Sequence, residues 1–254
     1  MRFREYTFLL VLDCTRRFVC PAPHGKDMVN SRSATIATLS SSFLVGLERP
    51  AADAILAAAR IQRISAKNNI STEGCRASHL FLVQSGRARF YHLTKQGKLV
   101  LLAWLVPGDV IGLVTIVKTP LRYMATAEAI SDCEVLAWEH SVIRNLASFH
   151  PLLAENAFRI SLGYLRTFLD RHTGLVTKTA EERLAGILVR LSDQSGRSHP
   201  EGIEIRATND ELSALADISP FTASRVLNNW VHAGVVSKGR GRVLLHAPEA
   251  LMIG

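Results

Sequence analysis

The chain has 254 residues, of which 48% are hydrophobic and 20% charged, and it contains 16 glycines and 9 prolines. This composition excludes a disordered, collagen-like or low-complexity protein, and the length suits two domains that each bury a core. No apolar run approaches the roughly 18 residues of a membrane span, so we expect no membrane protein. The four cysteines, at positions 14, 20, 75 and 133, lack metal-site spacing, and they favour a reducing, cytoplasmic location.

The formal net charge is +8, but the charge is unevenly distributed. Residues 1–50 carry seven basic and four acidic side chains, residues 51–178 carry fifteen and nine, and residues 179–254 carry eight and nine, which gives +3, +6 and −1. The total is therefore weak support for nucleic-acid binding, and the distribution of charges within the last segment is more informative.

The first 27 residues combine a basic start with a short apolar patch, as signal peptides do. Asp13 interrupts the patch and Arg16 and Arg17 follow it, so the segment lacks an export signal. Met28 stands just before the first organised segment. We expect residues 1–42 to be an extension, of which residues 1–27 are dispensable, and translation from either Met1 or Met28 remains open.

A β-rich region follows a helix predicted over AADAILAAARI, residues 51–61. The strand-like runs are HLFLVQSG, RARFYHL, KLVLLAWLVPGD, ATAEAI and CEVLAWE, and turn residues separate them. Short runs of this kind predict a small all-β barrel or sandwich from about residue 66 to 139, within a domain over 43–149.

The periodicity then changes to that of a long helix, which begins near Pro151. Its apolar positions are spaced by 4, 3, 4, 3 and 4 residues, the pattern of a heptad seam: Phe158, Leu162, Leu165, Leu169, His172 and Val176. Such a seam either packs on its own barrel or pairs with the same helix of a second copy. Its length favours the second interpretation, so we predict a dimerisation helix over 150–178.

The last segment, residues 179–254, contains strong helix-start signals. Thr179 with Glu182, and Thr208 with Glu211, have the spacing of capping boxes. Ser219 followed by Pro220 predicts a further helix start. Ala223, Val226, Leu227, Trp230 and Val231 fall on one apolar arc of that helix. A helix, a tight turn and a second helix are therefore predicted.

The opposite arc of this helix is polar and carries no acid, unlike an ordinary solvated face. After Gly234, the sequence VVSKGRGRVLLH alternates and turns like a β-hairpin, and residues 218–248 contain no acidic residue. We predict a winged helix-turn-helix whose second helix lies in the major groove, although a small α+β module without DNA is the plainer alternative. The predicted DNA contacts are Ser219, Phe221, Thr222, Ser224, Arg225, Asn228, Asn229, Lys238, Arg240 and Arg242.

This order of parts, with a G-D-x-I-G turn at 108–112, resembles the cyclic-AMP receptor protein / fumarate-nitrate regulator (Crp/Fnr) family of bacterial transcription factors over residues 43–247. The most specific stretches are FLVQSGRARFY, LVPGDVIG, residues 151–191 and LSALADISPFTASRVLNNWVHAGVVSKGRGRV. The resemblance implies an α+β fold with a cyclic-nucleotide-binding-like β-roll, a dimerisation helix and a winged helix-turn-helix. It also implies a homodimer that binds palindromic double-stranded DNA, contacts RNA polymerase and responds to an effector in the β-roll.

Three residue pairs depart from the cyclic-AMP-binding members of that family. The Gly-Glu pair for ribose corresponds to Gly112-Leu113, the Arg-Ser pair for phosphate to Tyr123-Met124, and the Thr-Ser pair for purine to Phe168-Leu169. Arg122 lies one position away and aligns only with a gap. A phosphodiester would be poorly compensated there, so cyclic AMP is not expected. The predicted effector pocket is Gly112, Leu113, Arg122, Tyr123, Met124, Phe168 and Leu169, for an apolar or aromatic effector unless the site has closed.

Two other function classes compete with a DNA-binding regulator. A metal cupin needs two histidines one residue apart, whereas His79 is followed by Leu80-Phe81, so we predict no metal, cofactor or catalytic residue. A signalling or interaction subunit that does not bind DNA would be expected to lack Thr222 and Arg225, which are present. The sequence leaves open the effector, the target genes and the choice between activator and repressor.

Overall fold

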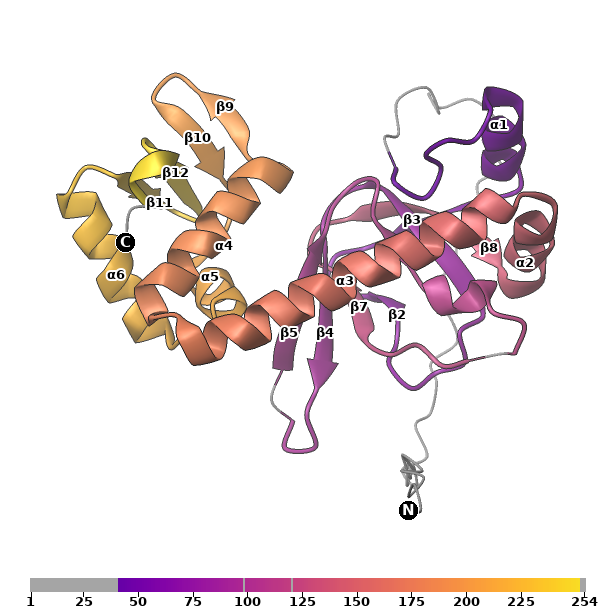
Figure 1. The fold of residues 1–254 in the computed structure, drawn as a ribbon, viewed down its shortest axis with the longest axis horizontal. Helices are drawn as coiled ribbons and strands as arrows, with labels where there is room; N and C mark the ends of the chain where they lie inside the picture. Colours follow the sequence, from indigo (N-terminus) through magenta and orange to yellow (C-terminus); the bar gives the residue numbers. More distant parts are fainter. Residues whose placement is uncertain (1–40, 98, 120, 252–254) are drawn as a thin grey trace, which may run out of the picture.

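The structure is a computed structural model and describes residues 41–97, 99–119 and 121–251. A β-rich unit and a helix-rich C-terminal unit are joined by one long helix, α3 (Figure 1). The predicted architecture is therefore confirmed. The predictions made for residues 1–40 lie outside the described residues.

The N-terminal unit is a roll of two antiparallel four-stranded sheets. The first sheet has the order β1 (Arg60–Ile64), β8 (Cys133–Glu139), β3 (His79–Ser85) and β6 (Val110–Ile111). The second has the order β2 (Asn69–Ser71), β7 (Thr126–Ala129), β4 (Ala88–Leu93) and β5 (Leu99–Leu105). Phe81, Val83, Leu105, Ile111 and Val135 are buried in the core of the roll, as the alternation of the predicted strands requires.

Helices cover the other face of the first sheet. Trp138 of β8 is fully buried, and its Nε1 donates to the carbonyl oxygen of Ile55 in α1 (Arg49–Ala57) at 2.7 Å. The side-chain amide of Asn156, in α3, donates to the carbonyl oxygen of Phe43 at 3.0 Å. Ser41 is buried as well and donates to the carbonyl oxygen of Gly108 at 2.8 Å. The packed part of the chain therefore includes Ser41 and Phe43, so it begins before the predicted domain boundary at residue 43.

Local predictions failed at three elements. The helix predicted over 51–61 ends at Ala57, and Ile61 lies in β1, because pairing along all of β1 with β8 outweighs the helix propensity of the alanines. Helix α2 (His140–Phe149) was not predicted. Neither was the hairpin of β9 (Arg197–His199) and β10 (Gly202–Ile205).

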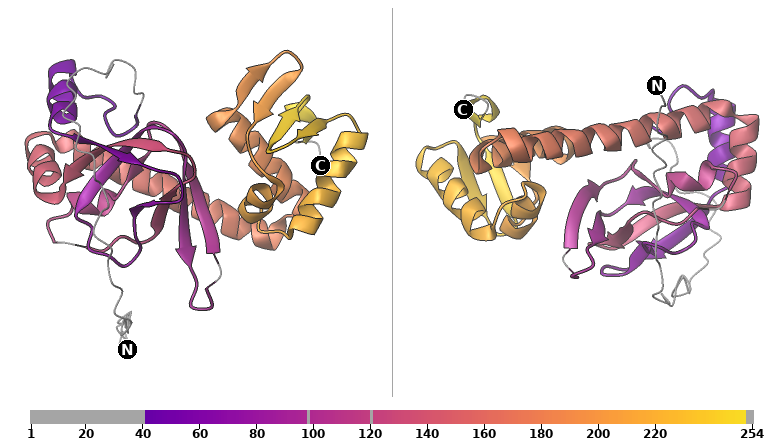
Figure 2. Two further views of the ribbon diagram at one scale, coloured as in Figure 1. Left: turned by 180° about the vertical axis from the view of Figure 1, so that it is seen from behind. Right: turned by 60° about the horizontal axis from the view of Figure 1, so that its bottom comes forward.

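Helix α3 (Pro151–Thr177) has 27 residues, which corresponds to a length of about 40 Å. It passes along the roll and continues beyond it to the C-terminal unit (Figures 1 and 2). Leu153, Asn156 and Ala157 are buried on its inner side. The helix therefore connects the two units and leaves its outer side uncovered.

The C-terminal unit is a winged helix-turn-helix. Its helices are α4 (Ala180–Ser195), α5 (Asn209–Leu215), α6 (Pro220–His232) and the short η2 (Pro248–Leu251). Its sheet has the order β11 (Val236–Gly239), β12 (Arg242–Leu245), β10 and β9. The capping boxes predicted at Thr179 and Thr208 are both formed.

The helices and the cysteines of the described chain were also compared with the sequence predictions. None of the helices in the described part of the chain has the length and apolar character needed to cross a membrane. Cys133 is a free, buried thiol.

Candidate nucleic-acid interface and effector cavity

The start of α6 is fixed by the residues that predicted it. The Ser219 hydroxyl oxygen accepts from the backbone N–H of Thr222 at 3.0 Å, and the two hydroxyl groups are 2.8 Å apart. Pro220 occupies the first turn, where its missing N–H has no helical partner. Its carbonyl oxygen accepts from the Asn209 amide at 2.9 Å, which ties α6 to α5.

Helix α6 separates a buried face from an exposed face. Its buried side chains are Ala223, Val226, Leu227 and Trp230. Trp230 Nε1 donates to Glu181 Oε1 at 3.0 Å and so anchors α6 on α4. Val231 was predicted on the buried arc but is 38% exposed, because it lies at the edge of the core.

The predicted DNA contacts of α6 lie on the exposed side of the helix. Phe221 is 78% exposed, an unusual position for an aromatic ring in a free surface helix. Ser219, Arg225, Asn228 and Asn229 are exposed too. Thr222 and Ser224 are half-buried at the boundary. This face therefore presents an aromatic ring, a guanidinium and amides, and none of its residues is acidic.

The hairpin of β11 and β12 forms the wing, and its cations differ in their surroundings. Lys238 Nζ donates to Asn228 Oδ1 at 3.1 Å, which links the wing to α6. Arg242 Nη1 lies 3.1 Å from Glu204 Oε2. Arg240 at the tip is exposed and makes no ion pair within the described residues. The prediction treated the three cations alike, but in the described structure Arg242 has a carboxylate partner, Lys238 has a neutral amide partner, and Arg240 has neither.

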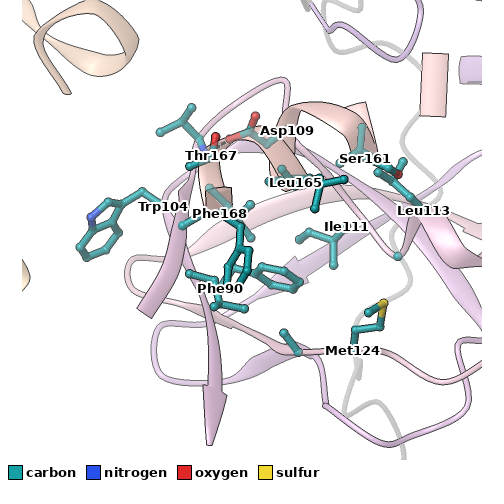
Figure 3. A pocket seen from close by; sticks show the side chains of 18 of the residues that line it. Phe90, Trp104, Asp109, Ile111, Leu113, Met124, Ser161, Leu165, Thr167 and Phe168 are labelled. Atoms are coloured by element: carbon teal, nitrogen blue, oxygen red, sulfur yellow. Dashed lines mark hydrogen bonds between the residues drawn. The ribbon is translucent and has the colours of Figure 1, made fainter. Parts of the chain in front are cut away.

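A cavity of about 770 Å³ lies between the second sheet of the roll, α3, and the start of the C-terminal unit. Figure 3 shows Phe90, Ile111, Leu165 and Phe168 around its centre, with Asp109 and Thr167 on one side and Met124 on the other. The predicted pocket residues in its lining are Gly112, Leu113, Tyr123, Met124 and Phe168.

Two predicted pocket residues lie outside this lining. Arg122 is exposed, and its guanidinium donates to the carbonyl oxygen of Gly74, because the chain around it bridges to Arg76. Leu169 is 53% exposed on α3, on the side that carries the heptad seam. Arg122 and Leu169, both predicted for the effector pocket, are therefore not part of the lining of this cavity.

Tyr123 closes one wall of the cavity. Its hydroxyl accepts from the backbone N–H of His79 at 3.1 Å and donates to the His79 carbonyl oxygen at 2.8 Å. Burial raises the pKa of the Tyr123 phenol. Gly112 packs against the same strand with φ +82°, and a Cβ there would lie 2.7 Å from the His79 carbonyl oxygen. A tyrosine held in this way is a neutral wall and not a phosphate ligand.

The charged lining residues were not predicted from the sequence. Asp109 Oδ2 accepts from the backbone N–H of Val106 at 2.9 Å, and burial raises the pKa of this carboxyl group. Burial also raises the pKa of Tyr164, and the nearby Asp109 adds to that shift. Arg171 of α3 and Arg190 of α4 line the cavity as well. They belong to separate helices, so no local motif could have grouped them with the roll.

The roll and the C-terminal unit contact each other beside the cavity. Leu101 is buried in the core cluster of the C-terminal unit, and Trp104 packs against that cluster. The Arg87 guanidinium lies 4.9 Å from the centroid of the Trp104 ring and donates to the carbonyl oxygen of Arg206 at 2.9 Å. Strand β5 therefore belongs both to the second sheet of the roll and to the interface between the units.

The predicted heptad seam lies on one exposed side of α3. Phe158 is 64% exposed and Val176 is 78% exposed. His172 stacks on Phe168, with ring centroids 6.4 Å apart. The complete exposed seam is Phe158, Leu162, Leu165, Leu169, His172 and Val176. A stripe of this length is typical of a helix that pairs with another helix.

The fold and the exposed face of α6 are those of a DNA-binding regulator with an attached β-roll domain. A profile of the cyclic nucleotide-binding domain matches residues 61–149, and one of the Crp-like helix-turn-helix domain matches residues 182–252. The chain belongs to the Crp/Fnr family of transcriptional regulators.

Individual relatives agree with this assignment. The cyclic AMP receptor protein of Thermus thermophilus is 33% identical over 165 residues, covering 65% of this chain and 73% of that protein. The nitrogen fixation regulation protein FixK of Azorhizobium caulinodans is 29% identical over 179 residues, covering 69% and 71%. The structure of FixK2 from Bradyrhizobium japonicum superposes with a TM-score of 0.67 at 24% identity, covering 76% and 96% of the two chains, and supports the fold.

Proposed function

We propose that the protein is a sequence-specific transcriptional regulator that binds a palindromic DNA site as a homodimer and responds to an effector in its roll. The observation that carries this proposal is the exposed face of α6, where Phe221 and Arg225 stand free beside the wing. A recognition helix that enters the major groove needs such a face. In this function the protein works in the cytoplasm and contacts RNA polymerase.

The homodimer follows from the exposed seam of α3. Six side chains of one stripe are left uncovered in a single chain, and burial of apolar surface contributes about 25 cal/mol per Å². A second copy of the same helix presents the complementary stripe. Two recognition helices related by a two-fold axis then match a palindromic site.

The effector proposed for this chain is not cyclic AMP. Leu113 supplies no carboxylate for a ribose hydroxyl, and the Tyr123 hydroxyl is engaged by the backbone of His79. The centre of the cavity is aromatic and aliphatic, so a phosphodiester would lose hydration there without compensation. An apolar or amphipathic molecule fits this lining better.

The proposed function is tested by selection of binding sites from random duplexes with the full chain. We expect enriched palindromes whose half-sites lie about one helical turn of DNA apart, or a multiple of it. Enrichment of a single half-site would contradict the homodimer. Failure to enrich any sequence, with and without cell extract, would favour the interaction subunit that does not bind DNA.

A further inference from the structure

Arg190 of α4 is a half-buried cation at the end of the cavity nearest the C-terminal unit. Within the described residues it has no ion pair, and no carboxylate lies within bonding distance of its guanidinium. Burial lowers the pKa of Arg190, and the neighbouring positive charge of Arg171 lowers it further, while the nearby Asp170 carboxylate, which forms no ion pair with Arg190, offsets part of this shift. A half-buried guanidinium beside another cation is costly unless an anion pairs with it.

The other charged groups of the lining already have partners. The Arg171 guanidinium forms an ion pair with Asp217, with Nη2 2.9 Å from Oδ1 and Nε 3.2 Å from Oδ2. The Asp109 carboxylate accepts a backbone hydrogen bond from Val106. Arg190 is therefore the cation in the described lining that has no ion pair, and an external anion can fill that role.

The shape of the cavity separates this cation from an apolar region. Its lining runs along α3 from Ser161 to Arg171, ten residues or about 15 Å of helix. At the roll end most lining side chains are aromatic or aliphatic, with Phe90, Leu113 and Phe168 prominent, and Asp109 lies at one side (Figure 3). At the other end the lining residues come from α4 and α5. A ligand that fills it would be elongated, apolar at one end and anionic at the other.

We infer that the cavity binds an amphipathic organic monocarboxylate, whose apolar body lies between the roll and α3 and whose carboxylate pairs with Arg190. Such a ligand touches the sensor sheet and the first helix of the DNA-binding unit at once. Its binding therefore acts on the DNA-binding unit directly, without relay through the dimer helix. This regulatory consequence rests on the proposed function, whereas the binding site itself does not.

Calorimetric titration of the full chain with octanoate, decanoate, dodecanoate and biphenylacetate tests the inference. At least one acid is expected to bind saturably, and the matched alcohol or amine of the same chain length should bind about tenfold more weakly or worse, because it cannot form the charge-assisted pair. Absence of binding by all four acids would overturn the inference. Equal affinities for the acid and the alcohol would also overturn the inference. Tighter binding of the amine would overturn it as well, because it would show that Asp109 pairs with the ligand's charged group.

Variants identify the cation. Arg190→Gln should weaken binding of the acid about tenfold or more, and Arg190→Lys should retain most of the affinity. Arg197→Gln is the matched control, because Arg197 is exposed on β9 outside the lining, and it should bind like the parent chain. An unchanged affinity in Arg190→Gln would overturn the assignment. If that variant does not fold, the comparison of acid with alcohol on the parent chain and the Arg190→Lys variant still decide it.

The same preparation separates the inference from the proposed function. Selected duplexes are titrated with the parent chain, with and without the tightest-binding acid. Duplex binding without any acid binding would overturn the inference and leave the regulator intact. Acid binding that depends on Arg190, without any duplex binding, would support the site and overturn the proposed function.

Discussion

Arg171 of α3 forms a bidentate ion pair with Asp217 in the turn between α5 and α6, with Nη2 2.9 Å from Oδ1 and Nε 3.2 Å from Oδ2. The same guanidinium donates through Nη1 to the carbonyl oxygen of Leu101 in β5 at 2.6 Å. Asp217 has a φ of +53°, a conformation that aspartate tolerates better than most residues. One side chain therefore joins α3, strand β5 and the turn that precedes α6.

Loss of this pair should uncouple the units and lower stability. We expect Asp217→Asn to reduce the free energy of unfolding by about 1.5–3 kcal/mol, because a largely shielded guanidinium loses its charged acceptor. Asparagine tolerates the same backbone conformation, so the change isolates the charge. Urea unfolding followed by tryptophan fluorescence measures the effect.

The matched control for that measurement is the exposed pair of Arg159 and Glu155, one helical turn apart on α3. Glu155→Gln should cost only about 0.3–0.5 kcal/mol, as is usual for exposed pairs of this spacing. Equal losses in the two variants would show that the Arg171 contact is an ordinary surface pair and does not couple the units.

The seam of α3 is best tested at Leu162, which is 46% exposed and does not line the cavity. Leu162→Glu should produce monomers, because an unpaired charge buried between two helices costs several kcal/mol. These monomers should bind a palindromic duplex poorly, since half of the phosphate and base contacts are lost. Sedimentation velocity gives the oligomeric state. Thr177→Glu, an exposed position beside the seam, should remain dimeric, and an intact Leu162→Glu dimer would place the interface on another face.

Asp109 makes stability depend on pH. Burial raises its pKa in the folded chain above the ordinary value of about 3.9, so the folded state holds the proton more tightly than the unfolded state. Its contribution to stability therefore falls as pH rises from about 4 through the folded pKa. Asp109→Asn keeps an acceptor for the Val106 N–H, and should be more stable than the parent chain at pH 7.

The advantage of Asp109→Asn should shrink as pH is lowered, because the parent carboxyl group is then neutral in both states. Thermal melts over a pH series measure it. Asp53→Asn, on the exposed side of α1, serves as the control and should show no such trend. A variant that is less stable than the parent chain at pH 7 would mean that the Asp109 carboxylate is needed in its charged form.

Cyclic nucleotides provide a direct check on the departures at Leu113 and Tyr123. Calorimetry with cyclic AMP and cyclic GMP should detect no binding, because neither residue offers a charged partner to the ribose or the phosphate. Saturable binding with a micromolar dissociation constant would show that Arg190 or another cation serves the phosphate. The Arg190→Gln variant would then separate those two possibilities.

Much of the fold could be predicted because local signals and tertiary packing agree. The capping box at Thr208 and the Ser219-Pro220 start give both helices of the DNA-binding motif, and strand alternation gives most of the roll. Strand β1 could not be predicted, since its pairing with β8 joins segments about seventy residues apart and opposes the local helix propensity. Helix α2 was recoverable, because Val142, Ile143 and Leu146 have helical spacing.

Part of the candidate site could likewise be predicted from the sequence, and part could not. The exposed face of α6 follows from one helical period, so Phe221 and Arg225 could be placed from the sequence alone. The cavity combines side chains from β4, β5, α3 and α4, and Arg190 is separated from Phe90 by a hundred residues. No period or motif relates positions that only the arrangement of the two units brings together.

Helix α6 and the wing should make different kinds of contact with DNA, to base edges and to phosphates respectively. Arg225 is exposed on the groove-facing side of α6, and a bidentate contact to guanine O6 and N7 discriminates by about 1–3 kcal/mol. Phe221 cannot accept a hydrogen bond from a cytosine amino group, and we expect its exposed ring to pack on a thymine methyl group instead. The half-site should therefore keep one strongly preferred guanine, with the adjacent C·G preference lost or replaced by T·A.

Arg240 at the wing tip should contact phosphate without sequence choice. On an array of half-site variants, Arg225→Ala should flatten the preference at one base pair, whereas Arg240→Ala should weaken all sequences alike and lower the salt dependence. Equal, sequence-blind losses from both variants would mean that Arg225 is a phosphate contact.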